Sequence, residues 1–402
     1  MSTKKSVNLE LGIHWESADA AHTDRYFAPN FDLNNTTIPE VLKEDLSALP
    51  TGATVEQSYA PGDLVSAYQS NNVRDIERSL FNAKLPNGMV LQLHSGRFYP
   101  RKFIAQAING SPTDNRPFRL LNVEADKLQI DLNHPLSRYA MELSATLLEQ
   151  PHCDHSTAQH SDIIAALCHS GPGMQALAPG ITTEFITEDA FVRKDSQCDS
   201  QFYRQPRLVA HLDKTALGQF SNFYRRFVRP GMKILDLMSS YKSHIPEDIG
   251  DLHITGLGMN QEEMLQNKQL RQHVVCDLNQ SAQLPLAVHD FDLAVCTVSV
   301  EYLINPINVF QQVARALKPG APFVVTFSER WFPPKVIQLW TQLHPFERMG
   351  LVLDYFRQSS AFNHLATESL RGLPRPKDDK YTAMMPYSDP LYAVWGYASE
   401  DR

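Results

Sequence analysis

Residues 234–244 read ILDLMSSYKSH, in which an apolar segment ends in an acid and small residues follow. The pattern predicts a strand that ends at Asp236 and a turn through Met238, Ser239 and Ser240 into a helix. A ligand at such a turn meets the free N–H groups at the helix start, which suit anionic groups. Glycine is usual there because the backbone must approach the ligand closely, and serine is the next smallest polar residue. Taken alone, the stretch leaves two interpretations open: a cofactor loop without glycine, or a strand that merely ends in Asp-Leu.

Candidate catalytic side chains follow a later apolar segment, DLAVCTV. Four polar residues lie at its end or just after it: Thr297, Ser299, Glu301 and Tyr302. Glu301 could act as a base or as a substrate anchor, although a solvated carboxylate at a helix start is the competing interpretation. His244 and His211 are further candidates for a pocket, but an isolated histidine is more often a packing or capping residue. The sequence therefore names Glu301, Tyr302 and His244 as catalytic candidates without deciding among them.

The elements that must position these residues alternate between strand and helix. The expected strands are residues 232–237, 253–258, 272–277, 292–298 and 322–328, with 391–398 as a closing edge strand. The expected helices are residues 210–228, 261–270 and 305–318. This alternation implies a doubly wound, mostly parallel sheet, an α/β Rossmann-like fold that binds its ligand at the carboxyl ends of the strands.

This half of the chain resembles the class I S-adenosylmethionine-dependent methyltransferases. The resemblance rests on four segments in order: KILDLMSS, ITGLGMNQEEML, VVCDLNQSAQLPLAVHDFDLAVCTVSVEYLINP and VARALKPGAPFVVTFSER. These segments lie within residues 201–330, and the domain is assigned to residues 201–402. The resemblance implies S-adenosylmethionine as the cofactor, with Asp236 near its amino-acid end and Asp277 near its adenine amine.

Two features depart from the family pattern. Met-Ser-Ser stands where the family has glycines, and the second strand ends in Gly-Leu-Gly-Met-Asn where the family usually has an acid. An amide such as Asn260 could still hydrogen-bond a ribose hydroxyl, without the charge. The order of the segments favours the cofactor-loop interpretation. The cofactor-binding candidates are Asp236, Met238, Ser239, Ser240, Asn260, Asp277, Leu278 and Thr297.

The first half of the chain resembles the SlyD-type FKBP proline isomerases. Residues 96–149 carry the resemblance, chiefly through an Asn-His-Pro-Leu turn at 133–136, and residues 38–56 resemble the single FKBP helix and its following strand. The resemblance implies a β-rich α+β FKBP-like domain over residues 1–150 that binds or isomerises a proline-containing segment. The candidate pocket residues are Tyr26, Phe27, Ile38, Leu42, Tyr59, Tyr139 and Leu143. The alternative is that these side chains fill a small β core. The FKBP catalytic aspartate has no clear counterpart, and the candidates are Asp24 and Asp32.

Strand patterns in this half are expected at residues 7–13, 88–94, 103–108, 117–124, 127–132 and 139–149. Residues 151–200 are rich in His, Gly and Pro, and they predict a connecting region with one short helix near 161–169. The run HCDH at 152–155, with His160, has metal-ligand residue types. Because no second cluster follows at zinc-site spacing, a solvated linker is the preferred interpretation, and no metal site is assigned.

Bulk composition limits the remaining function classes. A chain of 402 residues exceeds one ordinary domain, so two are expected. The net charge of −8 argues against nonspecific nucleic-acid binding, because no basic excess can displace phosphate counterions. No apolar run of membrane-spanning length occurs, so no membrane association is expected. Five scattered cysteines indicate a reducing compartment, so a cytoplasmic location is expected.

Two functions remain open at this stage. The first is a methyltransferase joined to an FKBP-like peptide-binding or isomerase domain, with a methyl acceptor whose class the sequence does not reveal. The second is an FKBP-like binding protein or chaperone whose methyltransferase half is a degenerate scaffold. The serine-substituted loop favours the second function, whereas the order of the strands, Asp236 and Asp277 favour the first.

Overall fold

The computed structural model describes residues 6–32, 39, 42, 46, 50–82, 91–148 and 162–400. These residues group into two compact units, and each unit is described by itself. The first unit comprises residues 1–187 and 344–350, and the second comprises residues 188–343 and 351–402. The division after Thr187 falls inside the connecting region expected at 151–200.

The first unit contains an antiparallel run of strands in the order β2, β1, β8, β3. Their bounds are β1 Ser6–Glu16, β2 Ala21–Asp32, β3 Thr54–Tyr59 and β8 Met141–Leu148. Alternate side chains of β8, such as Leu143 and Ala145, are buried, as expected for a strand with one face on a core. The helix α2 (Ile163–Cys168) packs on this core and is capped by Asp162, whose side chain accepts a hydrogen bond from the Ala165 backbone.

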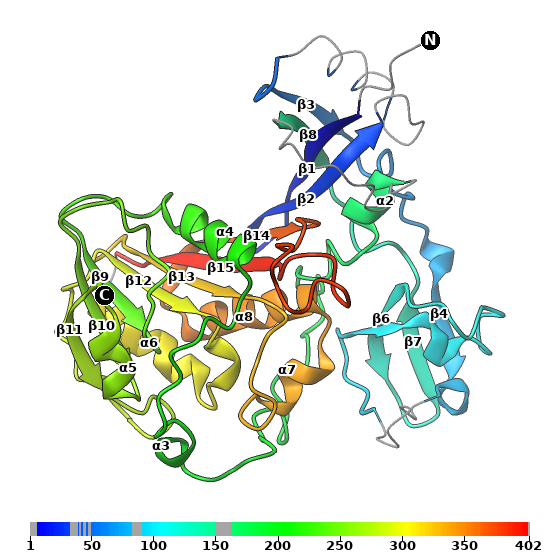
Figure 1. Ribbon diagram of the computed structural model, residues 1–402. Helices are drawn as coiled ribbons and strands as arrows, with labels where there is room; N and C mark the ends of the chain where they lie inside the picture. The colour runs from blue at the N-terminus through cyan, green and yellow to red at the C-terminus, as the bar shows by residue number, and fades with distance from the viewer. Residues whose placement is uncertain are drawn as a thin grey trace. The chain divides into compact units, whose positions relative to one another are not determined.

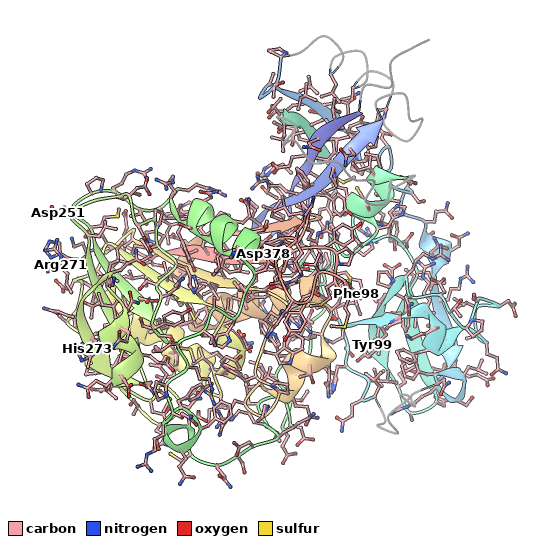
Figure 2. The ribbon with its side chains drawn as sticks, viewed as in Figure 1. Phe98, Tyr99, Asp251, Arg271, His273 and Asp378 are labelled. Carbon is pink, nitrogen blue, oxygen red and sulfur yellow. The ribbon has the colours of Figure 1, made fainter. Side chains whose placement is uncertain are left out.

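A second antiparallel sheet of the first unit is formed between β3 and β8 in the chain, in the order β4, β7, β6, β5. Its strands are β4 Val73–Glu77, β5 Phe98–Pro100, β6 Pro117–Val123 and β7 Lys127–Asp131. Short 3₁₀ turns η1 Ser70–Asn72, η2 Arg78–Leu80 and η3 Arg101–Ile104 connect them. Phe98 and Tyr99 of β5, labelled in Figure 2, are buried.

The sequence predicted the strands of this unit only in part. The strands expected at 7–13, 117–124, 127–132 and 139–149 are confirmed as β1, β6, β7 and β8. The strand expected at 103–108 is wrong, because η3 and a turn occupy these residues. Residues 91–94 of the strand expected at 88–94 are also not extended in a sheet. Of the helix expected within residues 38–56, Leu42 and Leu46 are described, and both are helical and buried.

The second unit is built on strands in the order β11, β10, β9, β12, β13, β15, β14 (Figure 1). Their bounds are β9 Lys233–Leu237, β10 His253–Gly258, β11 Leu270–Val275, β12 Leu293–Thr297, β13 Pro322–Phe327, β14 Phe362–Arg371 and β15 Leu391–Ala398. β9 to β13 are parallel to one another, and β15 runs antiparallel to both β13 and β14. The order turns back at β9, so the carboxyl ends of β9 and β12 form a topological switch point, where ligands of such sheets bind.

Helices cover both faces of this sheet, with α4 on one face and α6 and α8 on the other in Figure 1. The helices are α3 Asp199–Phe202, α4 Lys214–Tyr224, α5 Gln261–Gln266, α6 Pro306–Ala316, α7 Gln338–Gln342 and α8 Pro345–Ser359, with a 3₁₀ turn η4 at Val300–Tyr302. The first residues of α8 group with the first unit. α6 begins with Pro306, whose missing N–H costs nothing in a first turn, and it buries Val309, Phe310 and Val313 on one face.

The α/β prediction for this half is confirmed, with two corrections. β15 is not an edge strand, because β14, which the sequence analysis missed, pairs on its far side. β11 begins and ends two residues earlier than expected, so Asp277 lies beyond the strand and in the loop that follows it. Among the described residues, no helix is long and apolar enough to cross a membrane.

Candidate active site

A cavity of about 510 Å³ opens at the carboxyl ends of β9, β10 and β12 in the second unit. Its volume lies in the range of small-molecule and cofactor sites. All eight predicted cofactor-binding residues line this cavity: Asp236, Met238, Ser239, Ser240, Asn260, Asp277, Leu278 and Thr297. The topology therefore brings together residues that lie up to about sixty positions apart in the chain.

The loop after β9 is tightly held although it contains no glycine. Met238 adopts a φ of 58°, a left-handed conformation that a residue with a Cβ adopts at a cost. The Ser239 backbone N–H donates to the Leu257 carbonyl at 2.9 Å, so the loop lies directly against β10. The glycine is instead on β10, because a Cβ on Gly258 would lie 2.2 Å from the Ser239 carbonyl oxygen. The close approach that Gly258 allows is therefore between this loop and β10.

Asp236, at the end of β9, is buried beneath this loop. The Ser239 hydroxyl donates to its carboxylate at 2.6 Å. Burial raises the pKa of Asp236 to about 7, although hydrogen bonds from Ser239 and Ser243 oppose the shift. The carboxyl group can therefore change its charge near neutral pH when a cationic group arrives beside it.

Glu263 on α5 is a cavity-lining carboxylate that the sequence analysis missed. It accepts hydrogen bonds from the Ser240 hydroxyl at 2.6 Å and from the Arg207 backbone N–H at 2.7 Å. Asn260 is the N-cap of α5: its amide oxygen accepts from the Glu263 backbone at 3.0 Å, and its amide nitrogen donates to the Tyr203 carbonyl at 2.8 Å. The spacing Asn-x-x-Glu is a capping-box signature, which could have drawn attention to Glu263.

The hydrogen bonds of Asn260 differ from the expected contact between its amide and a ribose hydroxyl. Both ends of its side-chain amide are engaged by the protein, so its amide positions α5 and closes the loop at Tyr203. Glu263, one turn further on, presents a carboxylate to the cavity instead. A carboxylate is thus present on the first turn of the helix that follows the second strand, and both of its oxygens accept hydrogen bonds from the protein.

Asp277 and Leu278 line the cavity beyond β11. The Asp277 carboxylate accepts from the Asn279 backbone at 2.9 Å, and burial is the main cause that raises its pKa above the ordinary value. The Asn279 amide donates to Asp199 and to the Tyr302 carbonyl, at 3.0 Å each. This amide therefore fixes the loop between β11 and the first turn of η4.

The end of β12 is also held in a strained conformation. Val298 has a φ of 47°, which is a genuine outlier for a β-branched residue, and its backbone N–H donates to the Thr326 carbonyl at 2.7 Å. The Thr297 hydroxyl lies 2.6 Å from the Tyr224 hydroxyl. Met238, His244 and Val298 all have positive φ and all line the cavity. Strained residues of this kind concentrate at functional sites.

The three catalytic candidates are placed differently. His244 lines the cavity, and burial, followed by the positive neighbours Lys242 and His211, lowers its pKa to about 4. Tyr302 also lines the cavity; its hydroxyl accepts from the Phe332 backbone at 2.8 Å, and burial raises its pKa well above the ordinary value. Glu301 is buried in η4 and is not among the cavity-lining residues. The expectation of a solvated helix-start carboxylate is therefore wrong for Glu301.

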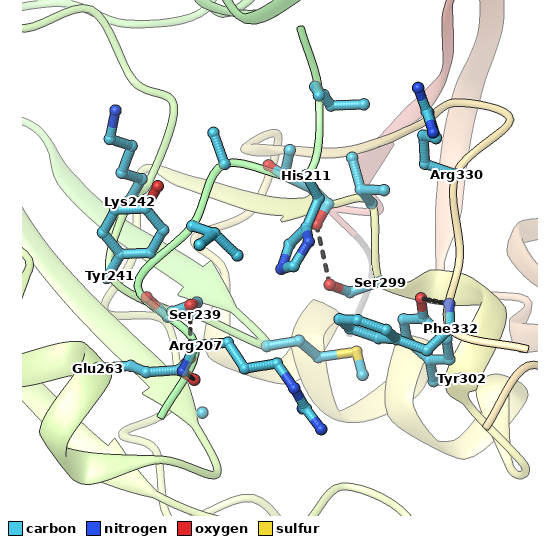
Figure 3. A pocket seen from close by; sticks show the side chains of 18 of the residues that line it. Arg207, His211, Ser239, Tyr241, Lys242, Glu263, Ser299, Tyr302, Arg330 and Phe332 are labelled. Carbon is cyan, nitrogen blue, oxygen red and sulfur yellow. Dashed lines mark hydrogen bonds between the residues drawn. The ribbon is translucent and has the colours of Figure 1, made fainter. Parts of the chain in front are cut away.

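Aromatic side chains close one side of the cavity, as Figure 3 shows around Phe332 and Tyr302. The Phe332 ring stacks on Tyr302 with centroids 5.9 Å apart and meets the His211 ring edge-on at 5.0 Å. The Arg207 guanidinium lies over Phe332, 5.1 Å from the ring centroid, and 4.4 Å from the centroid of Phe202. Such contacts exclude water from the inner part of the site.

A buried ion-pair cluster supports another part of the cavity lining. Asp389 accepts from Arg375 at 2.6 Å and from Arg330 at 2.9 Å, and its other oxygen accepts from the Asp213 backbone at 3.1 Å. Asp213 in turn caps α4 through the Ala216 backbone N–H at 3.1 Å. The cluster joins three walls that are remote in the chain: the start of α4, the segment after β13 and the segment between β14 and β15.

No group of three or more metal-ligand side chains occurs among the residues that the structure describes. The HCDH run at 152–155 and His160 lie outside the described residues.

Residues 243–325 match the family model described as a methyltransferase domain. No match was found among the curated proteins. A methyltransferase from Mesorhizobium loti is 17% identical, over 44% of this chain and 96% of that chain, with a TM-score of 0.28. An Aquifex aeolicus methyltransferase is 14% identical, over 50% and 97%, with a TM-score of 0.30. The [4+2]-cyclase SpnF is 14% identical, over 52% and 97%, with a TM-score of 0.32.

The family match and the cavity carry the assignment, rather than these distant structural similarities. The second unit contains a class I methyltransferase domain, the protein is a methyltransferase, and its cofactor is S-adenosylmethionine.

Proposed function

We propose that the cavity holds S-adenosylmethionine and a small methyl acceptor side by side, and that His244 accepts the proton that the acceptor loses. The observation that carries the proposal is that the eight cofactor candidates and His244 all line one cavity. Its volume of about 510 Å³ argues against a degenerate scaffold, because neither Met238 nor Tyr241, which both line the cavity, fills it.

The residues present fit the cofactor. Asp236 would face the amino-acid end and Asp277 the adenine, while Glu263 would take the ribose hydroxyls in place of Asn260. The fit rests on the cavity volume of about 510 Å³ and on the three carboxylates that line the cavity. When bound, S-adenosylmethionine supplies an electrophilic methyl group on a positively charged sulfur.

The protein contributes positioning and a proton acceptor. Backbone hydrogen bonds from Ser239 to Leu257 and from Val298 to Thr326 hold the two loops between which the reactants would lie. The His244 ring has no hydrogen bond to another described residue, and its pKa of about 4 keeps it neutral at physiological pH. The neutral imidazole has a lone pair that can accept a proton from an acceptor O–H, N–H or S–H group, and the same burial makes it a weaker base than an ordinary imidazole.

The test is titration calorimetry with S-adenosylhomocysteine, followed by a turnover assay with labelled S-adenosylmethionine. The wild-type protein and His244→Gln should bind S-adenosylhomocysteine equally, and the variant should lose about a hundredfold in turnover. If the wild-type protein did not bind S-adenosylhomocysteine, the proposal that the cavity holds the cofactor would be wrong. Unchanged turnover in His244→Gln would remove the base assignment alone.

For the first unit, the proposal is an FKBP-like domain that binds a proline-containing segment. It is supported by the insertion of the second sheet between β3 and β8, with the Asn-His-Pro-Leu turn at the return. Asn133 of this turn ties the two connections together, because its amide oxygen accepts from the Gln69 backbone at 2.8 Å and its amide nitrogen donates to the Gln69 carbonyl at 2.9 Å.

The candidate pocket residues of this unit support the FKBP-like proposal less than its strand order does. Tyr26, Phe27 and Leu143 are buried, which agrees with a role in packing, whereas Tyr59 and Tyr139 are partly buried at the edge of the core. Asp24 is buried and accepts hydrogen bonds from Trp15 and Gln175, at 3.0 Å each. A proline-peptide isomerisation assay on the full chain tests the proposal, and an unchanged rate would leave peptide binding as the only role. Ile38, another candidate pocket residue, lies outside the described residues.

The cytoplasmic location of the protein remains a prediction.

A further inference from the structure

Three hydroxyl groups form a chain where α4 meets the carboxyl ends of β12 and β13. The Tyr224 hydroxyl oxygen lies 2.6 Å from the Thr297 hydroxyl oxygen and 2.6 Å from that of Thr326. Thr297 and Thr326 are opposite each other on the two parallel strands, so one phenol can reach both. Tyr224 and Thr326 are fully buried, whereas Thr297 is partly exposed and lines the cavity. The chain of hydroxyls therefore begins inside the sheet and ends at the cavity.

The number of hydroxyl hydrogens in this chain exceeds the number of its hydrogen bonds by one. Three hydroxyl groups carry three hydrogens, and two hydrogen bonds use two of them. Neither Tyr224 nor Thr326 has a side-chain hydrogen bond to any other described residue. A spare hydrogen on either of them would be buried without an acceptor, which is unfavourable. Burial raises the pKa of Tyr224 above its ordinary value, so the phenol keeps its own hydrogen.

These conditions fix the direction of the two hydrogen bonds. Thr326 donates to Tyr224, Tyr224 donates to Thr297, and the spare hydrogen belongs to Thr297 at the cavity. The neighbouring hydroxyl of Ser299 is already used, because it donates to the Thr297 carbonyl at 2.9 Å. Of these two hydroxyls at the end of β12, Thr297 is the one whose hydrogen remains for a ligand.

Thr297 stands beside Asp236 on the neighbouring strand. Val295 is opposite Asp236 in the pairing of β12 with β9, and Thr297 lies two residues after Val295. Side chains two residues apart point to the same face of a sheet, so the Thr297 hydroxyl and the Asp236 carboxyl lie on one face. The Asp236 charge also contributes to the raised pKa of Tyr224, as expected for groups that lie close together. A carboxyl group and a hydroxyl donor therefore stand at adjoining strand ends.

We propose that Thr297 donates its hydrogen bond to the carboxylate of the cofactor's amino-acid part, and that Tyr224 is the positioning residue that directs this donor. An α-amino acid carries an ammonium and a carboxylate on one carbon, and these match the Asp236 carboxyl and the Thr297 hydroxyl respectively. The inference rests on the proposed function, because it requires S-adenosylmethionine in the cavity. It adds to that function a donor for the one cofactor group that the three cavity carboxylates would repel.

The experiment is titration calorimetry on the full chain with two ligands, S-adenosylhomocysteine and its decarboxylated form, which keeps the ammonium group. The measured quantity is the ratio of the two affinities within each variant, so a change in stability that affects both ligands alike cancels. The wild type should prefer S-adenosylhomocysteine by at least tenfold. Thr297→Val should lose about tenfold of this preference, and Thr297→Ser, which keeps a hydroxyl, should restore it.

The role of Tyr224 is tested through its dependence on Thr297. Tyr224→Phe should lower the preference about fivefold when Thr297 is present, because the Thr297 hydroxyl then loses the partner that orients and polarises it. When Thr297→Val is already in place, adding Tyr224→Phe should leave the preference unchanged. Thr326→Val is the matched control, because it also removes a buried hydroxyl while Tyr224 can still donate to Thr297. Its preference should stay within twofold of the wild type.

The outcomes distinguish this inference from the proposed function. Failure of the wild type to bind S-adenosylhomocysteine would overturn both. Equal affinity of the wild type for the two ligands would overturn the carboxylate contact alone, as would an unchanged preference in Thr297→Val. The positioning role of Tyr224 would be overturned if Tyr224→Phe had the same effect with and without the Thr297 hydroxyl, or if Thr326→Val lost as much preference as Tyr224→Phe.

Discussion

Glu263 accepts hydrogen bonds from Ser240 and from the Arg207 backbone on the inner wall of the cavity. A carboxylate accepts such bonds more strongly than an amide, and an amide nitrogen would face one of the two donors. Glu263→Gln should therefore weaken S-adenosylhomocysteine binding by about tenfold, measured by calorimetry. The matched control is Glu262→Gln on the exposed side of the same turn, which should bind as the wild type does. Equal affinity in the two variants would exclude Glu263 from the cofactor site.

The raised pKa of Asp236 predicts that the free energy of unfolding depends on pH, and it determines the sign of that dependence. Its pKa of about 7 in the folded protein lies above the ordinary value of 3.8, so between these values the folded state binds the proton more tightly than the unfolded state does. The stabilisation by the proton is therefore complete below pH 3.8 and is lost as the pH rises towards 7. Asp236→Asn should unfold at higher urea concentration than the wild type at pH 7.5, and the advantage should shrink at pH 4.5. If Asp236→Asn were more resistant to urea than the wild type by the same amount at pH 7.5 and at pH 4.5, the raised pKa of Asp236 would be contradicted.

At the scale of elements, the loop after β9 depends on the strand beside it. A Cβ on Gly258 would lie 2.2 Å from the Ser239 carbonyl, so β10 and the loop would have to separate. Gly258→Ala should cost about 1–3 kcal/mol in the free energy of unfolding, as overpacked cores do, and should abolish cofactor binding. Gly250→Ala is the control, because a Cβ added to Gly250 would meet no other atom within 4 Å. Cofactor binding that survives in Gly258→Ala would show that the loop does not need this approach.

At the scale of the whole molecule, the chain returns to its first unit late in the sequence. Residues 344–350 group with that unit, and Glu347 accepts from the Arg97 guanidinium at 3.1 Å and from the Phe98 backbone at 2.9 Å. Arg97 and Glu347 are both buried. Removal of one partner from a buried ion pair leaves the other charge without compensation.

Glu347→Gln should therefore destabilise the protein by about 3 kcal/mol, measured by urea unfolding. The exposed Glu188→Gln is the control and should change the stability by less than about 0.5 kcal/mol. A stability loss in Glu347→Gln no larger than that of the control would mean that the Arg97 charge finds water or another partner when the carboxylate is removed.

The sequence by itself determined the strands around the cavity to within two residues, whereas α4 is four residues shorter than expected at each end and α5 is four residues shorter at its carboxyl end. The apolar segments that became β9, β10, β12 and β13 were predicted within one or two residues, as were α2 and α6. Their periodicity reports only which side of each element is buried, and this depends on neighbouring residues in the chain. For the same reason, Asp236 could be assigned to a strand end and Ser239 to the turn after it before any contact was known, whereas Asp277 lies two residues beyond the end of its strand.

Only the tertiary structure decided which side chains meet in the cavity. It placed Glu263 on the wall while the Asn260 amide was engaged by Tyr203 and the helix backbone, and it buried Glu301 away from the cavity. It also set the glycine that the loop needs on β10. These facts depend on which residues meet across the sheet, and such meetings are fixed by the packing of distant segments, which no local pattern in the chain encodes.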